Sequence, residues 1–317
     1  MLTELMSALC ERRLLKRRLK HIRSETLPYK NVMTMHDTFG HAFDHSRPMI
    51  LGLASEFLPS DMTSSLASHQ VITVRFLLDR VTSTPVSILR LIVADPVLAA
   101  PDCASLHRSA FEAAVNLLYL VHRDRPERLR SFYTMAFESE RRMYNAIQRW
   151  REHDDQDIVA YANYQLSIQG PPTDAARDEL FAQLGIDNRD DVERYPNIQQ
   201  RCTDLGPIWE FFYDAKFRGL SAWQHGDTSR AAVSSSLMMH LPQYSDRTVF
   251  ESLIILIWTW ELIYHLICAM ADVANVPLPE SLNNTNAICH ATASHCMREA
   301  LEKYHLPVAQ SEPPSAA

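Results

Sequence analysis

Glycine is scarce in this chain, and its scarcity restricts the fold more than any other feature of the sequence. Only 7 of the 317 residues are glycine: Gly40, Gly52, Gly170, Gly185, Gly206, Gly219 and Gly226. Phosphate-binding loops and dinucleotide fingerprints need clustered glycines, because the backbone must approach the ligand closely, so both are excluded. Alternation of apolar and polar residues between turns is almost absent, and 17 prolines separate segments with helical spacing. The sequence therefore predicts an all-α protein.

Proline and turn residues mark the expected helix ends. Pro48 is expected to end or redirect a helix within 31–57, and Ser83-Thr84-Pro85 is expected to cap a new helix over 86–95. Further helices are predicted from Pro101 to His122, from Arg125 to about Arg151, and from about Pro207 to Gly226. Residues 154–205 are predicted to form short helices and loops, as an insertion or lid.

The length and composition fit one sizeable helical domain. Hydrophobic residues make up 46% of the chain and charged residues 22%, which is typical of a soluble globular protein. A single helical domain is predicted over 28–305. Residues 306–317, rich in proline, alanine and serine, are predicted to be a disordered tail.

The N-terminal segment is predicted to be a separate basic amphipathic helix over 1–27, with leucines recurring at three and four residues. Residues 1–30 hold eight basic and three acidic residues, a net charge of +5, whereas the whole chain carries −7. The rest of the chain therefore carries a net charge of −12, and this negative charge opposes nonspecific nucleic-acid binding by the whole surface. Three interpretations of the basic face stay open: a solvated face packed on the body, an arm facing RNA or phosphate, and a helix on a membrane surface.

The cysteines and the first residues predict a cytoplasmic protein. The 6 cysteines are dispersed and form no Cys-x-x-Cys pair, as expected for reduced thiols. The first apolar stretch is broken by Glu4 and again by Glu11-Arg12-Arg13, so no signal peptide is predicted.

Residues 249–275 are almost continuously apolar and long enough to span a bilayer. However, Glu251, Glu261 and His265 interrupt this run, and a carboxylate in the middle of a membrane span is costly. We therefore expect a buried central helix and no integral membrane segment. Glu261 and His265 are four residues apart and are additional candidates for an interior site.

No metal or cofactor is predicted, although one cluster leaves the question of a metal open. Segment 289–296 has two cysteines and two histidines, but on a helix the histidines point well away from the cysteines. Segment 36–45 places carboxylates and imidazoles on one helical face without a recognised ligand pattern. Its members are His36, Asp37, His41, Asp44 and His45.

Two polar stripes interrupt otherwise apolar helices and carry the candidate site. At about 100° per residue, one helical face collects an acid, a base, a hydroxyl and an imidazole. These are Asp214, Arg218, Ser221 and His225. The second stripe is the i,i+4 pair of Arg108 and Glu112, next to the apolar face of its helix. Polar stripes on two helices of one bundle predict a shared interior site.

The two stripes resemble those of an uncharacterised bacterial all-helical family. The match rests on Leu-His-Arg-Ser-Ala-Phe-Glu at 106–112 and on Tyr213, Arg218, Ser221 and His225 at their spacing. This family has an Arg-x3-Glu helix and a Tyr/Arg…Ser-x3-His helix, and it is similar in turn to the broad HEPN group. The resemblance implies a HEPN-like helical bundle over about 60–275, with extra N- and C-terminal helices.

Many HEPN proteins are metal-independent ribonucleases with an Arg-x4-6-His motif, and Arg218 and His225 have six residues between them. The resemblance implies an endoribonuclease of a toxin or phage-defence kind, with RNA as substrate, a homodimeric assembly and an inhibitory partner protein. His225 would act as general acid/base, Arg218 would hold the phosphate, and Ser221 would orient either group. Asp214 would orient Arg218, and Arg108 with Glu112 would support the site from behind.

Two alternatives to catalysis stay open. The same arginine, glutamate, serine and histidine residues would also suit a buried structural network that locks helices together in an interaction module. They would equally suit a non-catalytic site for a small ligand.

Overall fold

The computed structural model describes residues 27–59, 63–96, 99–122, 125–218, 220 and 241–303. These residues form helices and connecting segments without any strand, so the all-α prediction is confirmed. The long helices are α2 (Leu27–Ser55), α3 (Ser65–Ala94), α4 (Ala99–His122), α5 (Arg125–Gln148), α12 (Leu241–Ala274) and α13 (Glu280–Lys303). The shorter ones are η1 (Arg149–Glu152), α6 (Gln156–Gln169), α7 (Asp174–Leu184), η2 (Arg189–Asp191), α8 (Ile198–Leu205), α9 (Pro207–Phe212) and η3 (Tyr213–Phe217).

The chain divides into two compact units. Unit 1 comprises 1–53, 79–114 and 211–317, and unit 2 comprises 54–78 and 115–210. The first part of α3 and the last part of α4 belong to unit 2, and the rest of both helices belongs to unit 1. The predicted N-terminal helix over 1–27 and the tail over 306–317 lie outside the described residues, apart from the start of α2.

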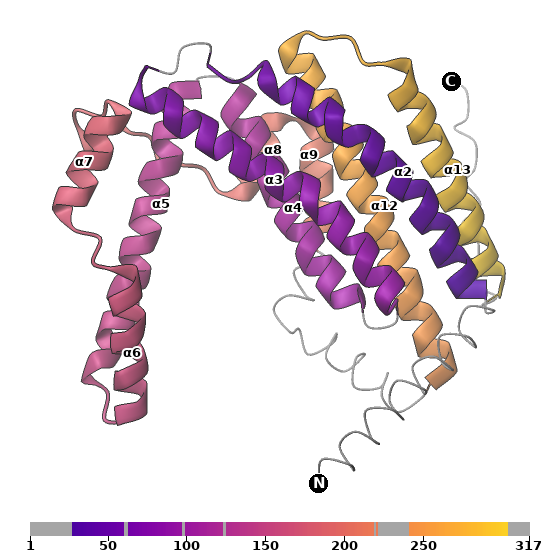
Figure 1. Cartoon of the computed structure of the whole chain (residues 1–317), viewed down its shortest axis with the longest axis horizontal. Coiled ribbons are helices and arrows are strands. Elements are labelled where there is room, and N and C mark those ends of the chain that lie inside the picture. Colours follow the sequence, from indigo (N-terminus) through magenta and orange to yellow (C-terminus); the bar gives the residue numbers. More distant parts are fainter. Residues whose placement is uncertain are drawn as a thin grey trace, which may run out of the picture. The chain divides into compact units, whose positions relative to one another are not determined.

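Unit 1 is built around α12, whose apolar residues pack against α2, α4 and α13. The Phe43 and Trp260 rings lie 5.9 Å apart, which joins α2 to α12. The Trp260 indole donates to Asn286 Oδ1 at 2.9 Å and so joins α12 to α13. Asn31 Nδ2 donates to the Cys296 carbonyl at 3.2 Å, and these contacts hold α2, α12 and α13 side by side (Figure 1).

Helix α12 contains the apolar run that the sequence singled out. Within the described residues, Val249–Ala274 is the one helical stretch long and apolar enough to cross a membrane. Just over half of its most apolar window, 56%, is buried inside the protein. Length and composition alone do not distinguish a membrane span from the central helix of a bundle.

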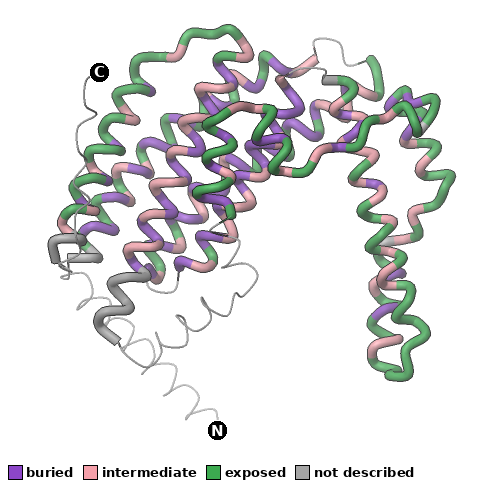
Figure 2. The backbone as a smooth tube through the Cα atoms, turned by 180° about the vertical axis from the view of Figure 1, so that it is seen from behind, coloured by how far each residue is buried: buried purple, intermediate pink, exposed green. Residues whose placement is uncertain are grey.

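Unit 2 is built on α5. Its small core contains Phe181, Leu184 and Ile186, packed against residues that include Tyr133 of α5. Arg130 Nε donates to the Leu184 carbonyl at 2.9 Å, which fixes the end of α7 beside α5. Helix α6, by contrast, is largely exposed (Figure 2). The short helices predicted over 154–205 are present as α6, α7, η2 and α8.

Helix α2 does not end at Pro48 and no new helix starts at Pro85, because α2 continues through the first proline and α3 through the second. The expected cap at Ser83-Thr84-Pro85 is therefore wrong, whereas a change of direction at Pro48 stays a prediction. Proline removes one backbone hydrogen bond from a helix but does not always end it, provided that tertiary packing and nearby groups compensate. The hydroxyl of Thr84 donates to the Arg80 carbonyl at 2.7 Å, and that of Ser46 donates to the Phe43 carbonyl at 3.0 Å. Thr84 is therefore a residue inside a helix and not part of a cap.

Candidate functional site

The candidate site is built on a helix with an irregular turn. Helix α9 begins at Pro207, as predicted, and passes into the π-helical segment η3. The backbone N–H of Arg218 donates to the Tyr213 carbonyl five residues earlier, where an α-helix would use the residue four earlier. Such wider turns are rare and occur often at functional sites. The turn lies directly before the Arg218–His225 motif.

The two faces of this turn differ in their exposure to solvent. Phe212, Lys216, Phe217 and Leu220 are buried. Asp214 and Arg218 form an ion pair of 3.3 Å in which their side chains remain 53% and 65% exposed. An interior position was expected for both residues, and the structure places both on the exposed side of the helix instead.

Lys216 is the buried charge of this site, and its partner is Glu261 of α12. The Lys216 ammonium is paired with the Glu261 carboxylate, and the two side chains are only 9% and 24% exposed. The same ammonium lies 3.9 Å from the centre of the Phe212 ring, which adds a cation–π contact. Burial lowers the pKa of Lys216, and the Glu261 carboxylate opposes part of that shift.

Two histidines lie near this pair. The His265 ring stands edge-on to Phe212, with the ring centres 5.2 Å apart. Burial lowers the pKa of His265, the Glu261 charge raises it, and the charges of Lys216 and His290 lower it. His107 of α4 is fully buried, and burial together with the Lys216 charge lowers its pKa to about 3. Both pKa values are lowered, so the neutral form of each imidazole is favoured.

Hydrogen bonding indicates which nitrogen of His107 carries the proton. The Thr259 hydroxyl donates to the Ile255 carbonyl at 2.7 Å, so its single proton is already used. His107 Nδ1 lies 3.0 Å from the same oxygen and must therefore donate to it. The lone pair of this neutral imidazole is consequently on Nε2, and the contact joins α4 to α12.

The helix of the first stripe packs against the helix of the second. Arg108 Nε donates to Glu112 Oε1 at 3.4 Å, as the i,i+4 spacing predicted. The Arg108 guanidinium also lies 4.4 Å from the centre of the Phe217 ring, and Phe111 lies 5.1 Å from that ring. The stem and head of Arg108 thus cover an aromatic residue that directly precedes Arg218.

The structure brings together some of the predicted site residues. Arg108 and Glu112 form one pair, Asp214 and Arg218 form a second, and the neighbouring Phe217 contacts Arg108. Glu261 and His265 lie in the same unit but gather around Lys216 and Phe212. Ser221 and His225 lie outside the described residues, so their position in the predicted site stays a prediction.

Sequence reasoning missed Lys216 and His107, although Lys216 left a recognisable signal. Phe212, Lys216, Phe217 and Leu220 recur at helical spacing, and Lys216 occupies a position in this apolar stripe. A lysine at such a position needs a buried counter-charge, because an unpaired buried ammonium is costly. The identity of that partner, 45 residues away on α12, could not be taken from the stripe.

The histidine cluster on α2 shows one internal contact, His36 Nδ1 to Asp37 Oδ1 at 3.0 Å. Among the described residues, no group of three or more histidine, cysteine, aspartate or glutamate side chains has the arrangement of a metal site. Four of the five described cysteines, at 103, 268, 289 and 296, have raised thiol pKa values, with burial as the largest cause, which makes them poor nucleophiles.

The described residues define a class of all-helical protein in which an Arg-x3-Glu helix packs on a helix with a π-turn and an exposed arginine. The chain belongs to DUF5677, a family of unknown function, whose model matches residues 74–236. That match includes both polar stripes and ends before α12. No curated protein and no solved structure matches the chain. Membership of an uncharacterised helical family was predicted and is confirmed, whereas the relation to HEPN proteins stays a prediction.

Proposed function

We propose that this protein is a HEPN-like, metal-independent endoribonuclease with Arg218 and His225 as its catalytic residues. The observation that carries the proposal is the state of Arg218. Its guanidinium is 65% exposed and held by Asp214 at 3.3 Å, directly after a π-helical turn. An exposed arginine that is oriented by one carboxylate can bind a phosphodiester without first leaving a buried pair.

The proposed chemistry is transesterification within the RNA strand. The ribose 2′-oxygen attacks the adjacent phosphorus, the bond from phosphorus to the 5′-oxygen breaks, and the products are a 2′,3′-cyclic phosphate and a 5′-hydroxyl. His225 takes the proton from the 2′-hydroxyl or returns one to the leaving oxygen. Arg218 stabilises the charge that builds on the phosphoryl oxygens, and Ser221 orients the phosphate or the imidazole.

The surrounding contacts give this helix a fixed position in unit 1. Phe217, directly before Arg218, is covered by Arg108 and Phe111. Lys216, one residue earlier, is anchored to Glu261. We propose that Arg108, Glu112 and Lys216 position the motif from its buried side, as catalytic groups need firm support.

The proposed setting follows from the same resemblance. We propose a homodimer, because one arginine and one histidine supply few catalytic groups and a two-fold axis would place two motifs together. We propose that the protein acts in the cytoplasm as a toxin or phage-defence effector. A protein that would damage the cell's own RNA also needs an inhibitory partner.

Arg218→Gln tests the proposal directly. The purified chain is incubated with total RNA in excess EDTA, and cleavage is followed on denaturing gels. Loss of the guanidinium should slow cleavage by about 10²–10³-fold, as loss of one transition-state donor typically does. Arg151→Gln is the matched control, because Arg151 is also exposed and holds one polar partner, Asn163 Oδ1 at 2.8 Å. No cleavage of any RNA by the wild type, or equal rates in both variants, would refute the proposal.

A second candidate function is a non-catalytic interaction module, favoured by the Lys216–Glu261 pair. A buried ion pair that joins η3 to α12 fixes how two helices pack, and such pairs can specify structure without any chemistry. In that case neither the wild type nor Arg218→Gln cleaves RNA. The free energy of unfolding also stays nearly unchanged in Arg218→Gln, because the Asp214–Arg218 pair is exposed. The RNA cleavage assay therefore separates the two candidates.

A further inference from the structure

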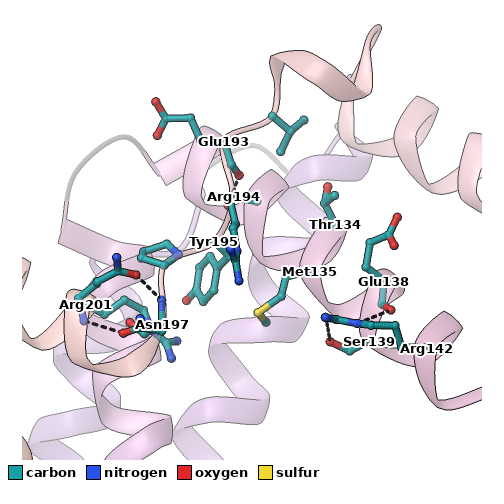
Figure 3. Close-up of a pocket in the computed structure, with 14 residues that line it drawn as sticks. Thr134, Met135, Glu138, Ser139, Arg142, Glu193, Arg194, Tyr195, Asn197 and Arg201 are labelled. Carbon is teal, nitrogen blue, oxygen red and sulfur yellow. Dashed lines mark hydrogen bonds between the residues drawn. The ribbon is translucent and has the colours of Figure 1, made fainter. Parts of the chain in front are cut away.

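Unit 2 contains a cavity that the proposed ribonuclease chemistry does not use. Its volume is about 780 Å³, within the range of about 300–1,000 Å³ that is usual for small-molecule sites. One wall is α5, from Ser131 to Arg142, and the other is the segment 192–201 that leads into α8. Figure 3 shows side chains from both walls turned toward the space between them.

Three arginines line this cavity, of which Arg142 and Arg194, one from each wall, are exposed and Arg201 is buried. Among the described residues, Arg142 donates to the Glu138 carbonyl at 3.2 Å and to the Ser139 hydroxyl at 3.3 Å, both on its own helix. Arg194 makes no hydrogen bond or ion pair within the described part of the chain. Neither guanidinium is paired with a carboxylate there, so both can bind an anion.

Two carboxylates, those of Glu138 and Glu193, also line the cavity, fewer than the three arginines of its lining. The hydrogen bond to Asp178 is the main reason why the pKa of Arg177 of α7 is raised, and the charge of Glu138 adds to this shift. Glu193 is exposed, and Figure 3 shows its carboxylate pointing away from Arg142. The backbone carbonyl of Glu193 accepts a hydrogen bond from Ser131 at 2.7 Å, which holds the loop against α5.

A buried hydroxyl in the wall of the cavity calls for a hydrogen-bond partner. The Thr134 hydroxyl is buried, and among the described residues it has no hydrogen-bond partner. Buried hydroxyls are nearly always hydrogen-bonded, so this atom points to a bound group. Next to it, Met135, Val192 and Pro196 supply apolar surface for the body of a ligand.

Side-chain contacts hold the end of the cavity at α8 in place. The buried Arg201 side chain donates to Asn116 Oδ1 and to the Asn197 carbonyl, and it lies 4.8 Å from the centre of the Tyr195 ring. Asn197 and Gln200 cap the first turn of α8 reciprocally. A preformed wall of this kind lowers the entropy lost when a ligand binds.

We propose that this cavity binds an organic phosphate of about nucleotide size. Arg142 and Arg194 would hold the phosphate from opposite walls, and the Thr134 hydroxyl would bond a polar group of the ligand. The volume is far larger than inorganic phosphate needs, and the apolar residues suit a base or another flat body. The inference does not depend on the ribonuclease proposal, because all of its residues belong to unit 2.

The ligand chemistry has two sources, a free nucleotide and a nucleotide within an RNA strand, and the test separates them. The four ribonucleoside diphosphates and a short single-stranded RNA are titrated separately into the full-length chain, in calorimetry with EDTA present. The His225→Ala form is used for the RNA so that the strand stays intact. Binding of a diphosphate alone identifies a free nucleotide, and binding of RNA alone identifies a strand.

Arg142→Gln and Arg194→Gln are each expected to weaken binding of the active probe by about tenfold or more, as loss of a charge-assisted hydrogen bond does. Thr134→Val should weaken it less. Arg149→Gln is the matched control, since Arg149 is an exposed arginine just beyond α5 that does not line the cavity. Failure of every probe to bind, full binding by the Arg142/Arg194 double variant, or an equal loss in Arg149→Gln would overturn the proposal.

Discussion

The Lys216–Glu261 pair makes the sharpest prediction for stability. Glu261→Gln removes the counter-charge and leaves the ammonium of Lys216 in a buried site. Breaking a buried pair in this way costs about 3–5 kcal/mol in general. Because the Glu261 side chain is 24% exposed, solvent screens part of the interaction, and we expect the free energy of unfolding to fall by about 2–4 kcal/mol.

The size of this effect should depend on pH in a defined direction. Burial lowers the folded-state pKa of Lys216 below its ordinary value of 10.5, so between these two values the unfolded chain binds the proton more readily. Protein stability therefore rises with pH through that window. A neutral lysine needs no counter-charge, so the cost of Glu261→Gln should shrink as the pH is raised from about 7 toward 10.

Urea unfolding, followed by circular dichroism, gives the free energy of unfolding of the wild type, of Glu261→Gln, of Lys216→Met and of the double variant, which together form a double-mutant cycle. Lys216→Met with Glu261→Gln should recover most of the lost stability, because an apolar residue of similar length replaces the ammonium. Asp214→Asn is the control on the same turn, and its exposed pair should contribute less than about 0.5 kcal/mol. Additive effects of the two substitutions, or a cost of Glu261→Gln no larger than that of Asp214→Asn, would refute the assignment of this buried pair.

Three other features of unit 1 lead to further expectations. His107 has a folded-state pKa of about 3, so it stays neutral in the folded protein while the same residue in the unfolded chain takes up a proton below about pH 6.5. The free energy of unfolding should therefore decrease as the pH is lowered from about 6.5 toward 3. The fall should be about 2 kcal/mol between pH 7 and 5 by urea unfolding, and His107→Asn should flatten it; an unchanged slope would exclude His107 as the source. Arg108→Ala should cost about 1–2 kcal/mol because it uncovers Phe217, whereas Glu112→Gln should cost less than about 0.5 kcal/mol by the same assay. Equal costs would contradict this account of Arg108. Cell fractionation should leave the untagged protein in the supernatant if 249–274 is a core helix, and membrane association that resists carbonate would contradict that expectation.

Much of the helical pattern could be predicted from local signals. The starts of the helices at Arg125 and Pro207 agree with the sequence, because proline and turn residues there coincide with a change in the apolar periodicity. Pro85 misled the prediction, since nothing local distinguishes a proline that ends a helix from one that tertiary packing keeps inside it. The helix types were therefore more predictable than their limits.

The candidate site was less predictable, for two physical reasons. The spacing of Asp214 and Arg218 suggested an interior stripe, but the stripe of Phe212, Lys216 and Phe217 is the buried one. A π-helical turn also changes which side chains share a face, so positions after it cannot be projected at a constant 100°. The partnership of Lys216 with Glu261 depends on how η3 and α12 pack, and periodicity within one helix contains no information about that.

The most direct test of the ribonuclease proposal combines two measurements on one preparation of His225→Ala. Cleavage of RNA in EDTA should fall by about 10²–10⁴-fold, as loss of a general acid/base does, while the melting temperature stays close to that of the wild type. The wild-type products should end in a 2′,3′-cyclic phosphate. An intact wild-type protein that cleaves no RNA, together with a His225→Ala variant that loses about 1–3 kcal/mol of stability, would show that the motif is a structural network.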